Sequence, residues 1–216
     1  MAFQAIVFDN DGLLLDTEHA WTRAEEALFE RHGSTFTQQH KRELIGTSRT
    51  ESAQILERQL GLPGRGEALT DELHELVMAE VAAGVPPRPG ALELVAAVRA
   101  AGVPVGLASN SAREFVEQVL DVAELTNGQF DVVVTADDVA APKPAPDIYL
   151  AACAALGAPP ESSAALEDSP PGVASARAAG MYVIAVPYFP DTPVEGASLV
   201  ASSLADAKVA AALGLG

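Results

Sequence analysis

The chain has 216 residues, and 13 Lys and Arg against 30 Asp and Glu give a formal net charge of −17. This acidic surplus argues against nucleic-acid binding, which needs a basic surface, and against docking on an anionic membrane. Apolar residues make up 49% of the chain and charged residues 20%, which is typical of a globular protein. We therefore expect a protein that handles small molecules or metal cations, as one large domain or one domain with an insertion.

The predicted elements begin with a short buried strand at residues 3–8, an apolar run that ends in the turn 9–12. Only helical patterns follow between about 17 and 86, with breaks at Gly46 and at 61–66. After residue 87, helices and strands alternate. The predicted helices there cover about 90–101, 111–120, 146–157, 170–179 and 204–213, and the predicted strands cover 103–108, 131–135, 164–167 and 182–186.

The alternation predicts an α/β fold with a doubly wound parallel sheet of the Rossmann-like kind. The helical block interrupts this pattern after the first strand, so we interpret it as an inserted all-helical cap. The expected division is a core domain of residues 1–16 and 87–216 and a helical cap domain of residues 17–86. The start has no basic leader, and the single cysteine, Cys153, lies among alanines, so we expect a cytoplasmic protein.

Polar side chains follow the predicted strands. Ligands of such sheets bind at the carboxyl ends of the strands, where these loops should meet at one edge. Oxygen ligands suit Mg²⁺, and the shortage of His and Cys nearby argues against zinc. The residues concerned are Asp9 and Asp11 after the first strand, Ser109 and Asn110 after the second, Lys143 in the loop after the third, and Glu167 and Asp168 after the fourth.

Each of these groups also has a plainer interpretation when it is taken alone. Asp9 and Asp11 fit an Asx turn that Gly12 closes, and Lys143 fits a solvated loop lysine. Ser109 fits an ordinary helix cap as well as an anion site at a helix start. Their joint placement at one sheet edge favours the functional interpretation.

Four segments, at 8–13, 109–111, 143–144 and 167–169, together resemble the motifs of the haloacid dehalogenase-like superfamily, in the same order. The resemblance covers nearly the whole chain. The helical insertion resembles the cap of the subfamily that contains sugar phosphatases, β-phosphoglucomutase and phosphoglycolate phosphatase. The runs 143–149 and 165–169 are especially similar to that subfamily.

The resemblance implies that Asp9 attacks phosphorus to form an aspartyl-phosphate, and that Asp11 acts as general acid and then general base. It implies that Mg²⁺ is held by Asp9, the backbone carbonyl of Asp11 and Asp168, with Glu167 in or near the coordination shell.

It also implies that Ser109 and Lys143 bind the transferring phosphoryl group, with Asn110 nearby. Asn10 stands where relatives usually carry an apolar residue, and we expect its side chain to point away from the site.

The cap should select the leaving group. The loop 46–52 resembles the specificity loop of β-phosphoglucomutase, where Arg49 would bind a second phosphate; the alternative is an arginine packed on its own helix. The segment 16–21 instead resembles hexose-phosphate phosphatases, which makes Glu18 and Trp21 candidates to line a sugar pocket; the alternative for Trp21 is a core residue of the cap. We expect Lys41, the only lysine of the cap, on a solvated helix face.

These features predict a Mg²⁺-dependent phosphatase that acts on small phosphate monoesters, with sugar phosphates as the expected class. The alternatives are a β-phosphoglucomutase, a phosphoglycolate phosphatase, or a catalytically silent binding protein on the same scaffold. We expect a small-molecule phosphate ester as the partner, no nucleic acid, no membrane, and a monomer.

Overall fold

The computed structural model describes residues 3–125 and 128–215. Within these residues, the strands form one parallel sheet of order β3-β2-β1-β4-β5-β6, which confirms the predicted doubly wound α/β fold. The strands are β1 (Ala5–Phe8), β2 (Val105–Ser109), β3 (Val132–Thr135), β4 (Ser163–Glu167), β5 (Tyr182–Ala185) and β6 (Leu199–Val200).

Both faces of the sheet are covered by helices, so its central strands are buried throughout. Ile6 and Phe8 of β1 point into one apolar cluster, whereas Val7 between them points into the other. Helices α5 (Ala91–Ala100), α6 (Arg113–Val122) and α9 (Ala207–Leu213) contribute to the first cluster, which continues into the helices between β1 and α5. Helices α7 (Asp147–Leu156) and α8 (Pro170–Ala178) contribute to the second.

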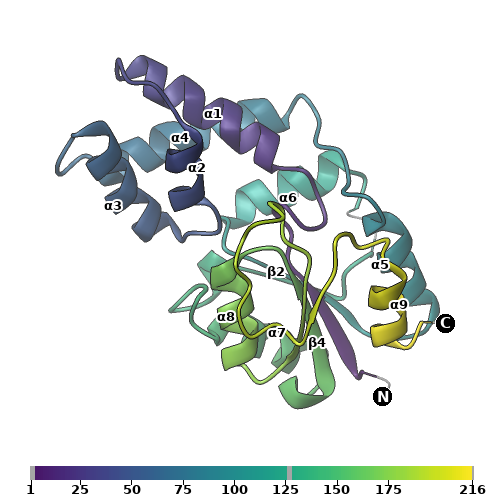
Figure 1. The fold of residues 1–216 in the computed structure, drawn as a ribbon. Coiled ribbons are helices and arrows are strands. Elements are labelled where there is room, and N and C mark those ends of the chain that lie inside the picture. Colours follow the sequence, from purple (N-terminus) through teal and green to yellow (C-terminus); the bar gives the residue numbers. More distant parts are fainter. Residues whose placement is uncertain (1–2, 126–127, 216) are drawn as a thin grey trace.

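Between β1 and α5 the chain forms α1 (Glu18–Arg31), α2 (Gln38–Leu44), α3 (Arg49–Leu60) and α4 (Gly66–Val81), here called the helical insert. Figure 1 shows it at the upper left, beyond the edge of the sheet. Helix α1 packs on α4, and α4 also packs on α3. Trp21 of α1 stacks against Phe115 of α6 with 5.2 Å between ring centroids, which joins the insert to the sheet layers.

The sequence analysis did not predict β6. It pairs with β5 through Ile184 opposite Leu199 and Ala185 opposite Val200, and its two residues are too few to show a strand periodicity. Among the described residues, no helix combines the length and apolar character that a membrane span requires.

Candidate active site

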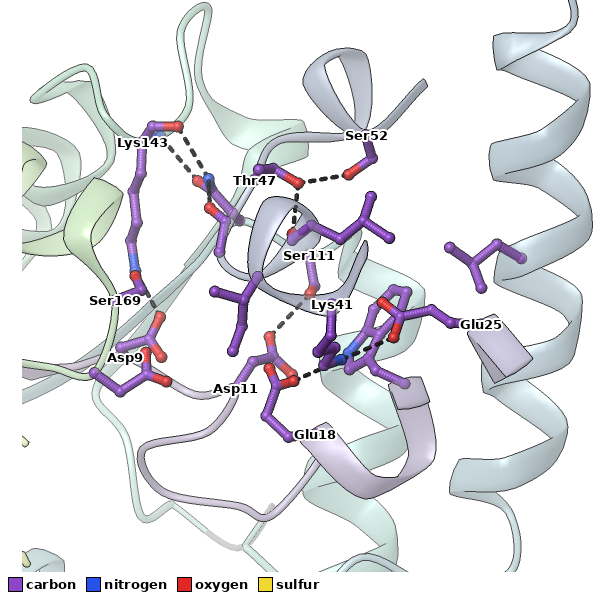
Figure 2. Close-up of a pocket in the computed structure, with 17 residues that line it drawn as sticks. Asp9, Asp11, Glu18, Glu25, Lys41, Thr47, Ser52, Ser111, Lys143 and Ser169 are labelled. Carbon is purple, nitrogen blue, oxygen red and sulfur yellow. Dashed lines mark hydrogen bonds and ion pairs between the residues drawn. The ribbon is translucent and has the colours of Figure 1, made fainter. Parts of the chain in front are cut away.

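The carboxyl ends of β1, β2 and β4 lie side by side because Phe8 is in register with Leu107 on one side and Leu166 on the other. The strand-end residues therefore meet at one edge, as predicted. A cavity that opens to solvent lies between this edge and the helical insert; its empty space, including the part open to solvent, is about 670 Å³ (Figure 2). Its lining on the sheet side includes Asp9, Asp11, Asn110, Lys143 and Asp168, and on the insert side Glu18, Trp21, Glu25, Lys41 and Leu73.

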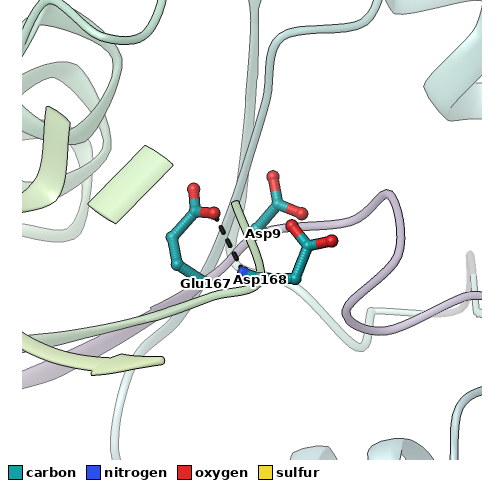
Figure 3. A group of neighbouring side chains, drawn as sticks. All are labelled: Asp9, Glu167 and Asp168. Carbon is teal, nitrogen blue, oxygen red and sulfur yellow. Dashed lines mark hydrogen bonds between the residues drawn. The ribbon is translucent and has the colours of Figure 1, made fainter. Parts of the chain in front are cut away.

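Three buried carboxylates, Asp9, Glu167 and Asp168, each offer an oxygen within 4.8 Å of the others (Figure 3). Asp9 Oδ2 is buried and has no hydrogen-bond partner among the described residues. Burial raises the pKa of both Asp9 and Asp168, and repulsion from Glu167 adds to the rise. An orphaned buried carboxylate oxygen within an oxygen-only donor set fits a divalent cation such as Mg²⁺.

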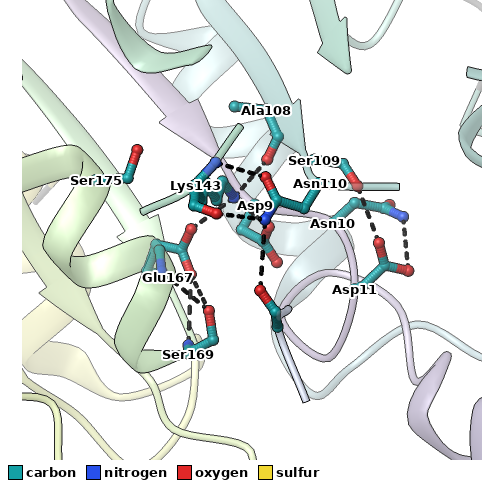
Figure 4. A network of polar contacts seen from close by, with 12 residues as sticks. Asp9, Asn10, Asp11, Ala108, Ser109, Asn110, Lys143, Glu167, Ser169 and Ser175 are labelled. Atoms are coloured by element: carbon teal, nitrogen blue, oxygen red, sulfur yellow. Dashed lines mark hydrogen bonds and ion pairs between the residues drawn. The ribbon is translucent and has the colours of Figure 1, made fainter. Parts of the chain in front are cut away.

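Lys143 is 3% exposed and makes three contacts through its ammonium group (Figure 4). The Nζ atom donates to Asp9 Oδ1 and Glu167 Oε1, both at 2.6 Å, and to the Ala108 carbonyl at 2.9 Å. Burial alone would lower the pKa of Lys143, but the charges of Asp9 and Glu167 outweigh this effect and raise it. The interpretation as a solvated loop lysine is therefore wrong, because the side chain is a fixed buried cation.

Asn110 holds the loop that carries Lys143. Its Oδ1 accepts from the Lys143 backbone N–H at 2.8 Å, and its Nδ2 donates to the Lys143 carbonyl at 3.0 Å. A longer contact of 3.4 Å joins Nδ2 to the carbonyl of Gly46 in the insert. Its amide thus ties the lysine loop to the end of β2.

Glu167 is fully buried, and both of its carboxylate oxygens accept hydrogen bonds. Oε1 accepts from Lys143 and, at 2.6 Å, from the Tyr149 hydroxyl; Oε2 accepts from the Asp168 backbone at 3.1 Å. The Ser169 hydroxyl reaches Oε2 at 3.2 Å and also accepts from Gly172 N at the start of α8. Sequence analysis gave Tyr149 no role; the available signal was its place in the first turn of the helix that follows Lys143.

Asp11 faces the hydroxyls at the end of β2. Its Oδ2 accepts from Ser109 Oγ and from Ser111 Oγ, both at 2.9 Å. Burial raises the pKa of Asp11, although these two hydrogen bonds lower it. Asn10 is fully buried and does not line the cavity; its Nδ2 lies 3.4 Å from Asp11 Oδ1.

The insert contributes a charge cluster that the sequence analysis missed. Lys41 is 6% exposed, and its Nζ lies 2.7 Å from Glu18 Oε2 and 3.0 Å from Glu25 Oε2. The expectation that Lys41 lies on a solvated helix face is wrong, because α2 places this side chain against α1. The available signal was the seven-residue spacing of Glu18 and Glu25, which places both on one face of α1.

Glu18 lies where it was expected, buried in the cavity lining, and Trp21 lines the same cavity. Arg49 does not. It begins α3, is half-exposed, and its guanidinium pairs with Asp71 of α4. It borders a second, neighbouring pocket together with His74.

The buried carboxylate, its lysine and its orphaned oxygen at a parallel sheet edge define a site suited to nucleophilic attack by a carboxylate on an anionic ligand. A family model of haloacid dehalogenase-like hydrolases matches residues 3–180 of the chain. The chain therefore belongs to the haloacid dehalogenase-like hydrolases, as its motifs suggested.

Individual relatives agree with this assignment. A probable pseudouridine-5'-phosphatase of Drosophila melanogaster is 36% identical over 214 residues, which cover 94% of this chain and 90% of that protein. A bifunctional riboflavin kinase/FMN phosphatase of Arabidopsis thaliana is 32% identical over 86% of this chain, which spans only 48% of that longer protein. The crystal structure of CbbY from Rhodobacter sphaeroides in complex with phosphate has a TM-score of 0.82 at 31% identity, covering 94% of this chain and 96% of that chain.

Proposed function

We propose that this protein is a Mg²⁺-dependent phosphatase that hydrolyses small phosphate monoesters, in particular sugar phosphates, through an aspartyl-phosphate on Asp9. The observation that carries the proposal is the Lys143 ammonium on Asp9 Oδ1, beside an Asp9 Oδ2 that has no protein partner. The names of the relatives, which include two phosphatases, support the same reaction.

In this mechanism one carboxylate oxygen of Asp9 attacks phosphorus and the other would hold Mg²⁺, while Lys143 neutralises charge on the phosphoryl group. Bound Mg²⁺ would supply further positive charge against the developing negative charge. Asp9, Asp168 and the backbone carbonyl of Asp11 would hold the ion. Glu167 would stabilise the site without binding the ion directly, because both of its oxygens already accept hydrogen bonds.

Asp11 would donate its proton to the leaving oxygen and then remove a proton from the water that hydrolyses the aspartyl-phosphate. Ser109 would release Asp11 and donate to the phosphoryl oxygens when substrate is present. Asn110 would act by positioning Lys143, since its amide is bonded to the backbone of that residue.

We further propose that residues 17–86 act as a cap over a core of residues 1–16 and 87–216, with Glu18 in the leaving-group pocket. Location in the cytoplasm and a monomeric state remain predictions from the sequence. A β-phosphoglucomutase would need a cation for a second phosphate. Arg49, the residue expected in that role, pairs instead with Asp71 at the surface, so hydrolysis is the better supported reaction.

A phosphate-release assay over sugar phosphates and phosphoglycolate, run beside an isomerisation assay on β-glucose 1-phosphate with a bisphosphate primer, tests the proposal. We expect release from sugar phosphates to stop in excess EDTA and to return on addition of Mg²⁺, because the crowded carboxylates need a counterion. Fast isomerisation with little phosphate release, or full activity in EDTA, would overturn the proposal.

Gly12 offers a second test of the metal site. Its φ is +76°, and a Cβ added there would overlap Asp168 Oδ2. We expect Gly12→Ala to displace Asp168 and to raise the Mg²⁺ concentration for half-maximal activity by about tenfold or more, the equivalent of one lost ligand interaction. Gly33→Ala is the matched control, since Gly33 has φ +68° with nothing within 4 Å of the added Cβ. Equal Mg²⁺ dependence of the two variants would refute the assignment of Asp168.

A further inference from the structure

The insert side of the cavity carries a buried ion cluster that the proposed chemistry does not use. The cluster consists of Glu18, Glu25 and Lys41, here called the insert cluster. The side chains of Lys41 and Glu25 are 7% and 3% exposed, and that of Glu18 is 8% exposed. Removing three charged groups from water is unfavourable, and their mutual attraction offsets this cost only in part. A buried cluster of this kind beside a cavity therefore suggests a role in ligand binding.

The insert cluster carries no net positive charge. Two carboxylates surround one ammonium, and burial raises the pKa of Glu25 to about 7. The net charge of the cluster therefore lies between −1 and zero near neutral pH. Lys41 donates a hydrogen bond to Glu25 Oε2, whereas Glu18 Oε2 lies 2.7 Å from Nζ as an ion pair and has no hydrogen-bond partner among the described residues. An ammonium has three N–H groups, so the cluster offers a ligand both a donor and an acceptor.

We propose that Lys41, held between Glu18 and Glu25, binds the hydroxyl groups of an uncharged leaving group and makes the site disfavour substrates with a second anionic group. This inference rests on the proposed phosphatase function and names its substrate class: monophosphates of neutral polyhydroxylated alcohols. A hydroxyl both donates and accepts, so it matches a cluster that offers one ammonium donor and carboxylate acceptors. Trp21, Leu44 and Leu73 line the same cavity and provide apolar surface for the carbon faces of such an alcohol.

A second phosphate would find no free cation in this cavity. Among the described residues that line it, Lys41 and Lys143 are the cationic ones. Lys143 would already be engaged by the transferring phosphoryl group, and Lys41 is paired with Glu18 and Glu25. A distal dianion would therefore lie against the carboxylates of the insert cluster, whose repulsion weakens its binding.

The test compares kcat and KM for sorbitol 6-phosphate, fructose 1,6-bisphosphate and phenyl phosphate, whose leaving group has no further hydroxyl. We expect the wild type to prefer sorbitol 6-phosphate to the bisphosphate. Lys41→Gln should lower kcat/KM for sorbitol 6-phosphate by about tenfold, mainly through KM, as the loss of one charged hydrogen bond predicts. It should leave phenyl phosphate nearly unchanged, and Lys41→Arg should restore part of the loss. Lys208→Gln, which changes an exposed lysine of α9, is the matched control.

A second variant covers the case in which Lys41→Gln does not fold. Glu25→Gln removes a carboxylate but keeps Lys41, so it should raise the relative kcat/KM for the bisphosphate over sorbitol 6-phosphate. An unchanged preference would overturn the inference, as would a wild type that prefers the bisphosphate, or an equal loss by Lys41→Gln on all three substrates. If instead Asp9→Asn still hydrolyses phenyl phosphate, the proposed function itself fails, which is a different outcome.

Discussion

Asp9→Asn is expected to stop phosphate release on every substrate, with kcat lowered roughly 10⁴-fold or more, as for other essential nucleophiles. An amide oxygen does not attack phosphorus in place of a carboxylate, so no aspartyl-phosphate forms. The exchange keeps the size of the side chain, and Lys143 Nζ, now 2.6 Å from Oδ1, can still donate to the amide oxygen. Binding should therefore survive the loss of turnover, and calorimetry with sorbitol 6-phosphate and Mg²⁺ should still detect it.

The matched control is Asp121→Asn, which makes the same exchange at an exposed position of α6. It should keep the wild-type rate. A rapid quench of the wild type with ³²P-labelled substrate should trap label on the protein, and Asp9→Asn should trap none. Wild-type turnover by Asp9→Asn would show that the nucleophile has been assigned wrongly, whatever the substrate.

The strand-end residues of the site could be predicted because a parallel sheet gathers the carboxyl ends of its strands at one edge. Asp9, Ser109 and Glu167 each end or follow a buried strand, and the order in which β2, β1 and β4 pair brings these ends together. Apolar periodicity and the turns identify such strands without knowledge of their neighbours.

The contacts on the insert side could not be predicted in the same way. The orientation of the short helix α2 about its axis decides whether Lys41 faces water or α1. The polar residues next to Lys41 in the sequence predicted a solvated face, which is wrong. Tyr149 and Glu167 lie 18 residues apart in sequence, and their 2.6 Å hydrogen bond depends on how α7 packs on the sheet. Contacts that depend on how helices pack produce no periodic pattern in a single sequence.

The distribution of charge in this site is compatible with anion binding by a strongly acidic protein. A net charge of −17 by itself opposes the approach of an anionic ligand. One end of the cavity contains Lys143 and three neighbouring carboxylates that are suited to bind a divalent cation. A phosphoryl group would meet positive charge there, whereas the insert cluster at the other end has no net positive charge. The local arrangement of charge, and not the total, decides which anion the protein accepts.

Lys143→Met should abolish turnover and also destabilise the fold. The ammonium is the buried counterion of Asp9 and Glu167, and its removal leaves two buried carboxylates without a cation. Breaking a buried ion pair from one side costs about 3–5 kcal/mol of unfolding free energy. Urea denaturation in EDTA should show a loss of this size near pH 7, whereas Lys208→Met, at an exposed position, should change stability by less than about 0.5 kcal/mol.

The pH dependence of that loss separates charge from packing. Burial already raises the pKa of Asp9, and removal of Lys143 raises it further because the opposing positive charge is gone. A carboxyl whose pKa is raised in the folded state destabilises the fold above its unfolded pKa, and the penalty disappears as it becomes protonated at lower pH. The deficit of Lys143→Met should therefore shrink from near pH 7 toward pH 4. The double variant Lys143→Met/Glu167→Gln should recover part of the stability at neutral pH, because it removes one unpaired charge. A deficit that is constant with pH, and equal in both variants, would mean that Lys143 stabilises the site by packing and not as a counterion.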